Sequence, residues 1–152
     1  MSALPPITEL LCHADVMLLL DRLIYADATT ARSESTVRAD NIFFQAPNGV
    51  PAYVGFELMA QTISAFDGLK RIAIGKPVVM GFLIGARKYS TVKPFFAEGE
   101  TLVTEVIALL GEEEMGSFQC RILNPAGEQL ASATINTFRP EDTEAFLRTQ
   151  LQ

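Results

Sequence analysis

The sequence predicts an α+β fold, in which a curved antiparallel sheet wraps around one long central helix. Two observations support this prediction: a very apolar helical segment in the middle of the chain, and a run of four strand-like segments after it. A helix that is apolar nearly all round must be covered on most sides, and a sheet that curves around it provides that cover.

The central helix is expected over Val54 to Ile74, where apolar side chains recur at steps of three and four residues. Further apolar residues lie between these positions, so the helix has little polar surface. Gly75 and Pro77 are expected to end it, because glycine accepts the left-handed conformation that closes a helix and proline does not continue one.

Six segments are expected to form the sheet, two before the helix and four after it. The last four are each bounded by turn residues, and several alternate between polar and apolar positions, as strands with one wet face do. The segments are Met17–Tyr25, Thr30–Arg38, Val78–Val92, Leu102–Leu110, Ser117–Leu123 and Gln129–Phe138. With a short helix over Ile7 to His13, they describe a single hot-dog domain over residues 1–152, a length sufficient for one substantial core.

Composition excludes several classes of function. The net charge of -6 argues against nucleic acid as a partner, because phosphate binding relies on clustered cations. No uncharged apolar run approaches the roughly 20 residues of a membrane span, and the first residues lack the features of a secretion signal. Cys12 and Cys120 are far apart and are expected to be reduced thiols in a cytoplasmic protein.

Glu57 is the candidate for acid–base chemistry. It is the only ionisable acid or base between Asn41 and Phe66, and it lies in the first turns of the apolar helix. A carboxyl among apolar neighbours loses solvation and is suited to donate as well as accept a proton. Gln61 lies one turn further on the same face and is placed to orient that carboxyl. The alternative is that Glu57 faces solvent and only stabilises the helix through its interaction with the helix dipole.

Two other places in the sequence carry ionisable side chains of interest. His13 is the only histidine, so any imidazole chemistry falls to it, although a histidine at a helix end often serves as a capping cation. Asp21 and Arg22 are expected to form structural ion pairs, with each other or with neighbours. Since the sequence has no phosphate-binding glycine loop, metal-ligand cluster or nucleophile elbow, no cofactor or metal is expected.

Three segments resemble the β-hydroxyacyl-(acyl carrier protein) dehydratases of bacterial type II fatty-acid synthesis. They are His13–Arg22, with its leucine-rich stretch ending in Asp-Arg; Pro51–Gln61, ending in Glu-Leu-Met-Ala-Gln; and Gly85–Glu100, with its Lys-Pro and Glu-Gly-Glu turn. Gly127–Phe138 is also similar to the last strand of that family. The likeness runs from about Leu10 to Phe138 in the same order and spacing.

This resemblance implies a hot-dog dimer with active sites at its interface. It implies that Glu57 helps to expel the β-hydroxyl, while a histidine takes the α-proton. It also implies that a backbone N–H at Gly85 and the N-terminus of the central helix polarise the thioester carbonyl. Gln61, Phe43 and Tyr53 are expected to line the substrate site beside these groups.

The sequence departs from the family at its histidine. Counting back from Glu57, that position holds Phe43, and phenylalanine cannot take a proton. The chain is thus more similar to the divergent dehydratase-like proteins of bacterial aryl-polyene clusters. Two outcomes follow: His13 takes the role of the base, or the chain is a weakly active or inactive subunit beside a complete dehydratase.

Three functions remain open at this point. The first is a hydro-lyase that dehydrates a β-hydroxyacyl thioester, the second a non-catalytic partner in a heteromeric dehydratase, and the third a hot-dog acyl thioesterase. The expected partners are an acyl carrier protein and a second hot-dog subunit, identical or homologous. Because acyl carrier proteins are acidic, docking is expected at basic residues, with these candidates: Arg87, Lys88, Lys93, Lys70 and Arg71.

Overall fold

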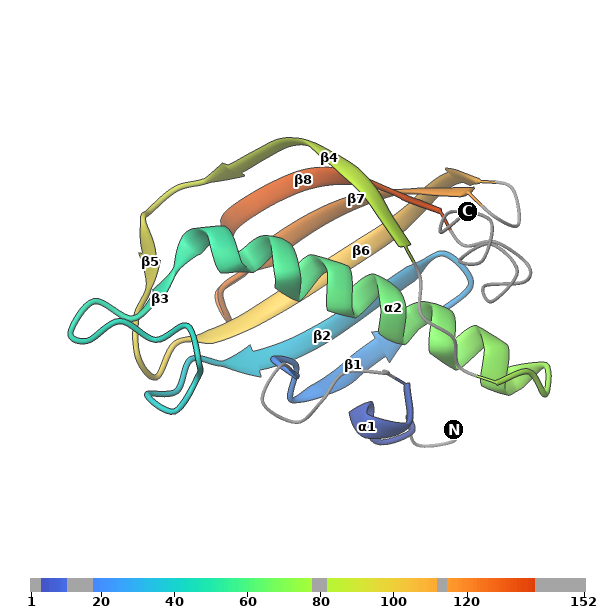
Figure 1. The fold of residues 1–152 in the computed structure, drawn as a ribbon, viewed down its shortest axis with the longest axis horizontal. Helices are drawn as coiled ribbons and strands as arrows, with labels where there is room; N and C mark the ends of the chain where they lie inside the picture. The colour runs from blue at the N-terminus through green and yellow to red at the C-terminus, as the bar shows by residue number, and fades with distance from the viewer. Residues whose placement is uncertain (1–3, 11–17, 78–81, 112–114, 139–152) are drawn as a thin grey trace, which may run out of the picture.

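The long central helix lies across one face of a six-stranded antiparallel sheet, as predicted (Figure 1). A computed structural model describes residues 4–10, 18–77, 82–111 and 115–138. The helices are α1 (Ile7–Leu10), the 3-10 turn η2 (Ala52–Val54) and α2 (Gly55–Ala73). The sheet runs in the order β1-β2-β6-β7-β8-β4, with these bounds: β1 (Arg22–Ala26), β2 (Thr30–Thr36), β6 (Thr101–Gly111), β7 (Met115–Leu123), β8 (Gln129–Phe138) and β4 (Phe82–Thr91).

Helix α2 begins and ends within one residue of its predicted bounds. Gly75 adopts φ +74°, and the N–H of Lys76 donates to the carbonyl of Arg71 at 2.8 Å. A glycine in this conformation lets the chain fold back onto the last carbonyls of the helix, which otherwise have no partner. Gly75 alone therefore predicted where the C-terminus of α2 lies.

Strand β1 begins at Arg22, later than the predicted Met17. Leu18 to Leu20 lie outside the strand, and the N–H of Leu19 donates to the side chain of Gln61 rather than to a neighbouring strand. Residues 11–17 lie outside the described residues. Asp21 forms an ion pair with Arg38, and Arg22 forms one with Glu34, both at 2.8 Å. Asp21 and Arg22 therefore pair with neighbouring residues rather than with each other.

The core lies between α2 and the middle strands of the sheet. Met59 and Phe66 of the helix are almost fully buried, against strand residues such as Val106 and Ile122. Burying one side chain of this size contributes roughly 2 kcal/mol. On its other side α2 packs against α1 so closely that a Cβ on Gly68 would lie 2.4 Å from the carbonyl oxygen of Leu10.

A two-stranded sheet of β3 (Val50–Pro51) and β5 (Phe95–Phe96), which was not predicted from the sequence, lies directly before η2 and α2. The N–H of Ala52 donates to the carbonyl of Pro94 and extends this contact into η2. Two-residue strands carry too few side chains to show a period, which explains the omission. In the described part of the chain, no helix combines the length and apolarity needed to cross a membrane.

Candidate functional site

Glu57 lies in the first turn of α2, and a buried amide holds its carboxyl. The side chain of Gln61, one turn further, is fully buried, and its Nε2 donates to Glu57 Oε1 at 3.1 Å. Its Oε1 accepts the N–H of Leu19 at 2.9 Å. The amide is thereby fixed from both ends, and Glu57, itself half-buried, has a defined orientation.

No side chain of a cap residue covers the start of the helix. Pro51 and Val54, at the N-cap positions of η2 and α2, make no side-chain cap. Unpaired N–H groups at a helix N-terminus favour negative charge. Tyr53 lies in η2 with 65% of its surface exposed, so the predicted substrate contact would be made on the open side of the helix start.

Gly85 lies on β4, the edge strand of the sheet, at a point where the pairing with β8 is irregular. Leu83 lies opposite Thr137 and Gly85 opposite Asn136, so β4 carries one extra residue between them. Nothing lies within 4 Å of the place where a Cβ on Gly85 would point. A bulge beside an open space leaves room for a ligand to approach the backbone here.

Phe43 lies in the loop between β2 and β3. It is half-buried and packs against the hydrophobic core, while its N–H donates to Asn41 Oδ1 at 2.7 Å. Phe43, at the position where the resemblance seen in the sequence places a histidine, thus has no proton-accepting atom in its side chain. His13 lies outside the described residues, so its expected role stays a prediction.

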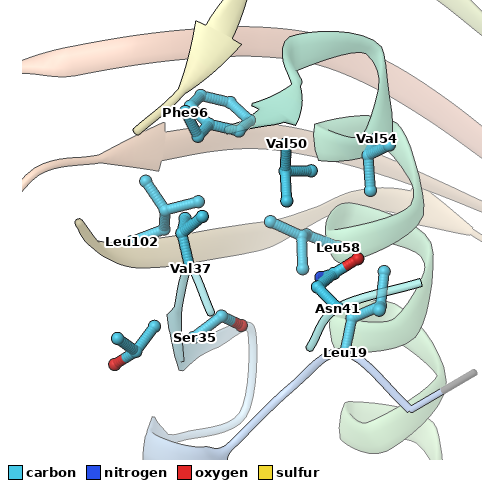
Figure 2. Close-up of a pocket in the computed structure, with 10 residues that line it drawn as sticks. Leu19, Ser35, Val37, Asn41, Val50, Val54, Leu58, Phe96 and Leu102 are labelled. Carbon is cyan, nitrogen blue, oxygen red and sulfur yellow. The ribbon is translucent and has the colours of Figure 1, made fainter. Parts of the chain in front are cut away.

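A small pocket lies between the start of α2, β2 and the loop after β2 (Figure 2). Its walls are mostly apolar and include Val54 and Leu58 beside Glu57, and Leu19, which also bonds Gln61. Ser35 Oγ is buried there without a hydrogen-bond partner among the described residues. The enclosed space of this pocket is about that of a single water molecule.

Tyr89 belongs to this region but was not singled out from the sequence. Its hydroxyl donates to the carbonyl of Ala52 in η2, and its ring meets that of Phe56, next to Glu57. Burial raises the pKa of Tyr89 to about 12. An aromatic residue in a strand is common, and nothing in the sequence indicates that this one turns toward the helix start.

The basic residues predicted to bind the carrier protein differ in the groups that their side chains contact. Lys93 Nζ contacts both carboxylate oxygens of Glu100, at 2.6 and 2.7 Å, and Lys70 lies 4.0 Å over the ring of Phe66. Arg71 donates to the carbonyl of Pro77. Lys88 is exposed, and the side chain of Arg87 lies outside what the structure describes. Lys88 therefore remains the exposed cation on the strand that carries Gly85.

The remaining reactive groups lie away from Glu57 or outside the described residues. Cys120 is fully buried, which raises the pKa of its thiol to about 12, and Cys12 is not among the described residues. A thiol with so high a pKa is a poor nucleophile near neutral pH. Within the described ranges, no group of three or more His, Cys, Asp or Glu side chains has the arrangement of a metal site.

The fold and this site together define a hot-dog protein with a carboxyl at the start of its central helix. The chain belongs to the ApeP-like dehydratase family: residues 5–148 match the family model, described as ApeP dehydratase. It is a dehydratase-like protein related to the aryl-polyene enzymes, in agreement with the resemblance seen in the sequence.

Solved structures agree with this assignment. A chain of the dehydratase heterocomplex ApeI:P from Xenorhabdus doucetiae is 27% identical, with a TM-score of 0.89; the match covers 97% of this chain and 99% of that one. The E. coli PaaI protein is 16% identical (TM-score 0.61, 78% and 82% covered). A hypothetical thioesterase with coenzyme A from Streptococcus pneumoniae is 17% identical (TM-score 0.58, 77% and 83% covered), and both support the fold alone. A search of curated proteins found no significant match.

Proposed function

We propose that this chain is one subunit of a heteromeric dehydratase, which removes water from a β-hydroxyacyl thioester carried by an acyl carrier protein. In this proposal Glu57 is the acid of the reaction. The observation that carries it is the pair formed by Glu57 and the fully buried Gln61, at the N-terminal turn of a helix in a dehydratase family.

The reaction needs one acid, one base and a site for the carbonyl. A base takes the proton from the α-carbon, and the electron pair of that C–H bond becomes the new double bond. The bond between the β-carbon and its hydroxyl breaks as Glu57 delivers a proton, and the hydroxyl leaves as water. The N–H groups at the start of α2 and at Gly85 would stabilise negative charge on the thioester oxygen.

The position of Phe43 is the reason to propose a second, different subunit. Since phenylalanine cannot serve as the base, the proton acceptor must be His13 or a histidine of another chain. The similarity to a chain of a dehydratase heterocomplex favours the second source. In this proposal a partner also supplies part of the wall of the acyl channel, since the pocket lined by Leu58 holds about one water molecule.

Lys88 is the proposed contact for an acidic carrier protein. It lies one residue from Tyr89, whose hydroxyl bonds Ala52 in the turn just before α2, so it is at the same end of the helix as Glu57. Lys70 lies 13 residues beyond Glu57, or about 20 Å along a helix that rises 1.5 Å per residue. A carrier that delivers its thioester to Glu57 would thus dock nearer to Lys88.

The proposal is tested by purifying the chain alone and together with a histidine-bearing hot-dog dehydratase from the same organism. Each sample is incubated with a β-hydroxyacyl carrier protein, and the unsaturated product is measured by mass spectrometry. We expect co-purification, with dehydration by the complex and little by the chain alone. A stable and fully active homodimer would reject the heteromeric proposal, and release of free thiol from the acyl carrier would indicate a thioesterase instead.

A further inference from the structure

Tyr89 contacts the start of the central helix from a distant strand. Neither Pro51 nor Val54 caps this end with its side chain. The hydroxyl of Tyr89 donates to the carbonyl of Ala52 in the 3-10 turn, and it lies against Gly55, the first residue of the helix. It thereby ties the turn that leads into α2 to strand β4.

The backbone around Tyr89 is shaped for this contact. Arg87 lies opposite Thr134 and Ser90 opposite Ser132, so Lys88 and Tyr89 together face a single residue of β8. Lys88 takes φ +53°, an uncommon conformation for a residue with a side chain. Such a bulge redirects side chains, and here it accompanies a tyrosine that reaches the helix.

The helix side of the contact is shaped as well. A Cβ on Gly55 would lie 2.3 Å from the Tyr89 hydroxyl, so only glycine leaves room for it there. The ring of Tyr89 meets that of Phe56 edge-to-face, with centroids 6.3 Å apart and planes at 88°. The tyrosine is therefore held both by its ring and by its hydroxyl.

This contact joins the two halves of the candidate site. Gly85 lies on β4 four residues before Tyr89, and Glu57 directly follows Phe56. The backbone of β4 otherwise runs largely out of reach of α2, which packs on β1, β2, β6, β7 and β8 in the described part of the chain. Tyr89 is the long side chain that spans this gap.

We infer that Tyr89 is a positioning residue for dehydration, which fixes the strand carrying Gly85 against the helix turn carrying Glu57. This inference rests on the proposed function. Because the hydroxyl donates its proton to a backbone carbonyl, it acts through the spacing of the two elements and not by moving a proton. Small errors in such a spacing are costly in the transition state.

The test is Tyr89→Phe in the complex of the two subunits, which keeps the ring contact with Phe56 and removes the hydroxyl. We expect kcat to fall about tenfold while KM changes less than about twofold, since the loss is in the transition state. The ratio of wild-type to variant kcat should be constant from about pH 6 to 9, because a positioning group does not titrate there. Tyr25→Phe is the matched control: its hydroxyl bonds Asp27 on the outer face of the sheet, and kcat should not change.

A second variant and a hydrogen-exchange measurement test the role of Tyr89 independently. Gly55→Ala places a methyl group where the hydroxyl sits, and should lower kcat as Tyr89→Phe does. Amide hydrogen exchange at Phe56 and Glu57 should be faster in Tyr89→Phe than in the wild type, whether or not the complex dehydrates the substrate. Unchanged kcat and unchanged exchange would overturn the inference, as would a kcat loss that varies with pH. An inactive wild-type complex with faster exchange in the variant would reject the proposed function and leave the anchoring role of Tyr89 supported.

Discussion

Glu57 and Gln61 show how one buried amide can serve both the fold and the site. Gln61 ties Leu19, before β1, to the first turn of α2, and the same side chain donates to Glu57. A half-buried carboxyl with one fixed donor is held in few orientations, which suits a group that must meet a substrate hydroxyl. A substitution that removes the Gln61 amide therefore removes both its bond to Leu19 and its bond to Glu57.

Replacing Gln61 with alanine should therefore lower both stability and activity. The N–H of Leu19 would lose its acceptor, which costs roughly 1–3 kcal/mol for a group away from water. Dehydration by the complex should fall about tenfold, because Glu57 would lose its orienting donor. Urea unfolding and a kcat measurement check the two effects. Gln129→Ala, at an exposed position of β8, is the control, and equal behaviour of the two variants would contradict the role of Gln61.

Glu105 is a second buried carboxyl, and it stabilises the sheet from its outer face. It is 2% exposed and accepts from Arg32 and Arg121, on the two neighbouring strands, each at 2.6 Å. Burial by itself would raise the pKa of Glu105, but the hydrogen bonds from Arg121 and Arg32 outweigh it and hold the pKa below its usual 4.5. A carboxyl with a lowered pKa adds stability above its unfolded pKa and loses that contribution as the pH falls.

The wild-type free energy of unfolding should accordingly decrease as the pH drops below about 4.5, and this decrease should be smaller in Glu105→Gln. At neutral pH the same substitution should cost about 2 kcal/mol, because the two guanidinium groups lose a buried partner. Glu34→Gln, which breaks the exposed pair with Arg22, should cost well under about 1 kcal/mol. Denaturant unfolding across the pH range measures the free energy of unfolding of the wild type and of both variants. A pH profile of Glu105→Gln identical to that of the wild type would count against this account.

Among the elements, the two helices meet at a contact that only glycine permits. Exchanging a glycine for alanine inside a helix ordinarily stabilises it by about 1 kcal/mol. Gly68→Ala should do the opposite, since the new Cβ would lie 2.4 Å from the carbonyl oxygen of Leu10 in α1. We expect a loss of about 1 kcal/mol or more in urea unfolding. A more stable variant would show that α1 does not pack on α2 in this way.

Element types were readable from the sequence because they depend on local patterns. The period of apolar residues predicted α2, Gly75 marked its end, and turn residues separated the strands after it. What depends on distant contacts was missed: the late start of β1, where Leu19 turns to Gln61, and the two-residue strands β3 and β5.

The same limit applies to the site. Glu57 and Gln61 lie four residues apart on one helix face, so their contact follows from helical geometry. The contact of Tyr89 with the helix start accompanies a bulge in β4, which the sequence does not reveal. The ion pairs of Glu105 with Arg32 and Arg121 depend on the register of three neighbouring strands. Sequence patterns within one element do not carry that information.

For the molecule as a whole, the proposed docking of an acidic carrier depends on exposed charge. Lys88→Ala should weaken carrier binding several-fold at low salt, and the difference from wild type should shrink as salt is added, because exposed charges are screened. Lys76→Ala, an exposed cation just beyond the far end of α2, is the matched control and should change little. A titration by calorimetry at two salt concentrations measures this. Equal effects of both variants would argue against docking at the Glu57 end.

The central claim is that Glu57 of this chain acts as the acid when the chain is assembled with its partner. The most direct measurement is the dehydration rate of the reconstituted complex with Glu57→Gln in this subunit only, beside Glu98→Gln at an exposed position. Glutamine keeps the shape but does not deliver a proton in this role, so we expect dehydration to be abolished while the complex assembles and unfolds as the wild type does. Turnover equal to that of the wild-type complex would contradict the account.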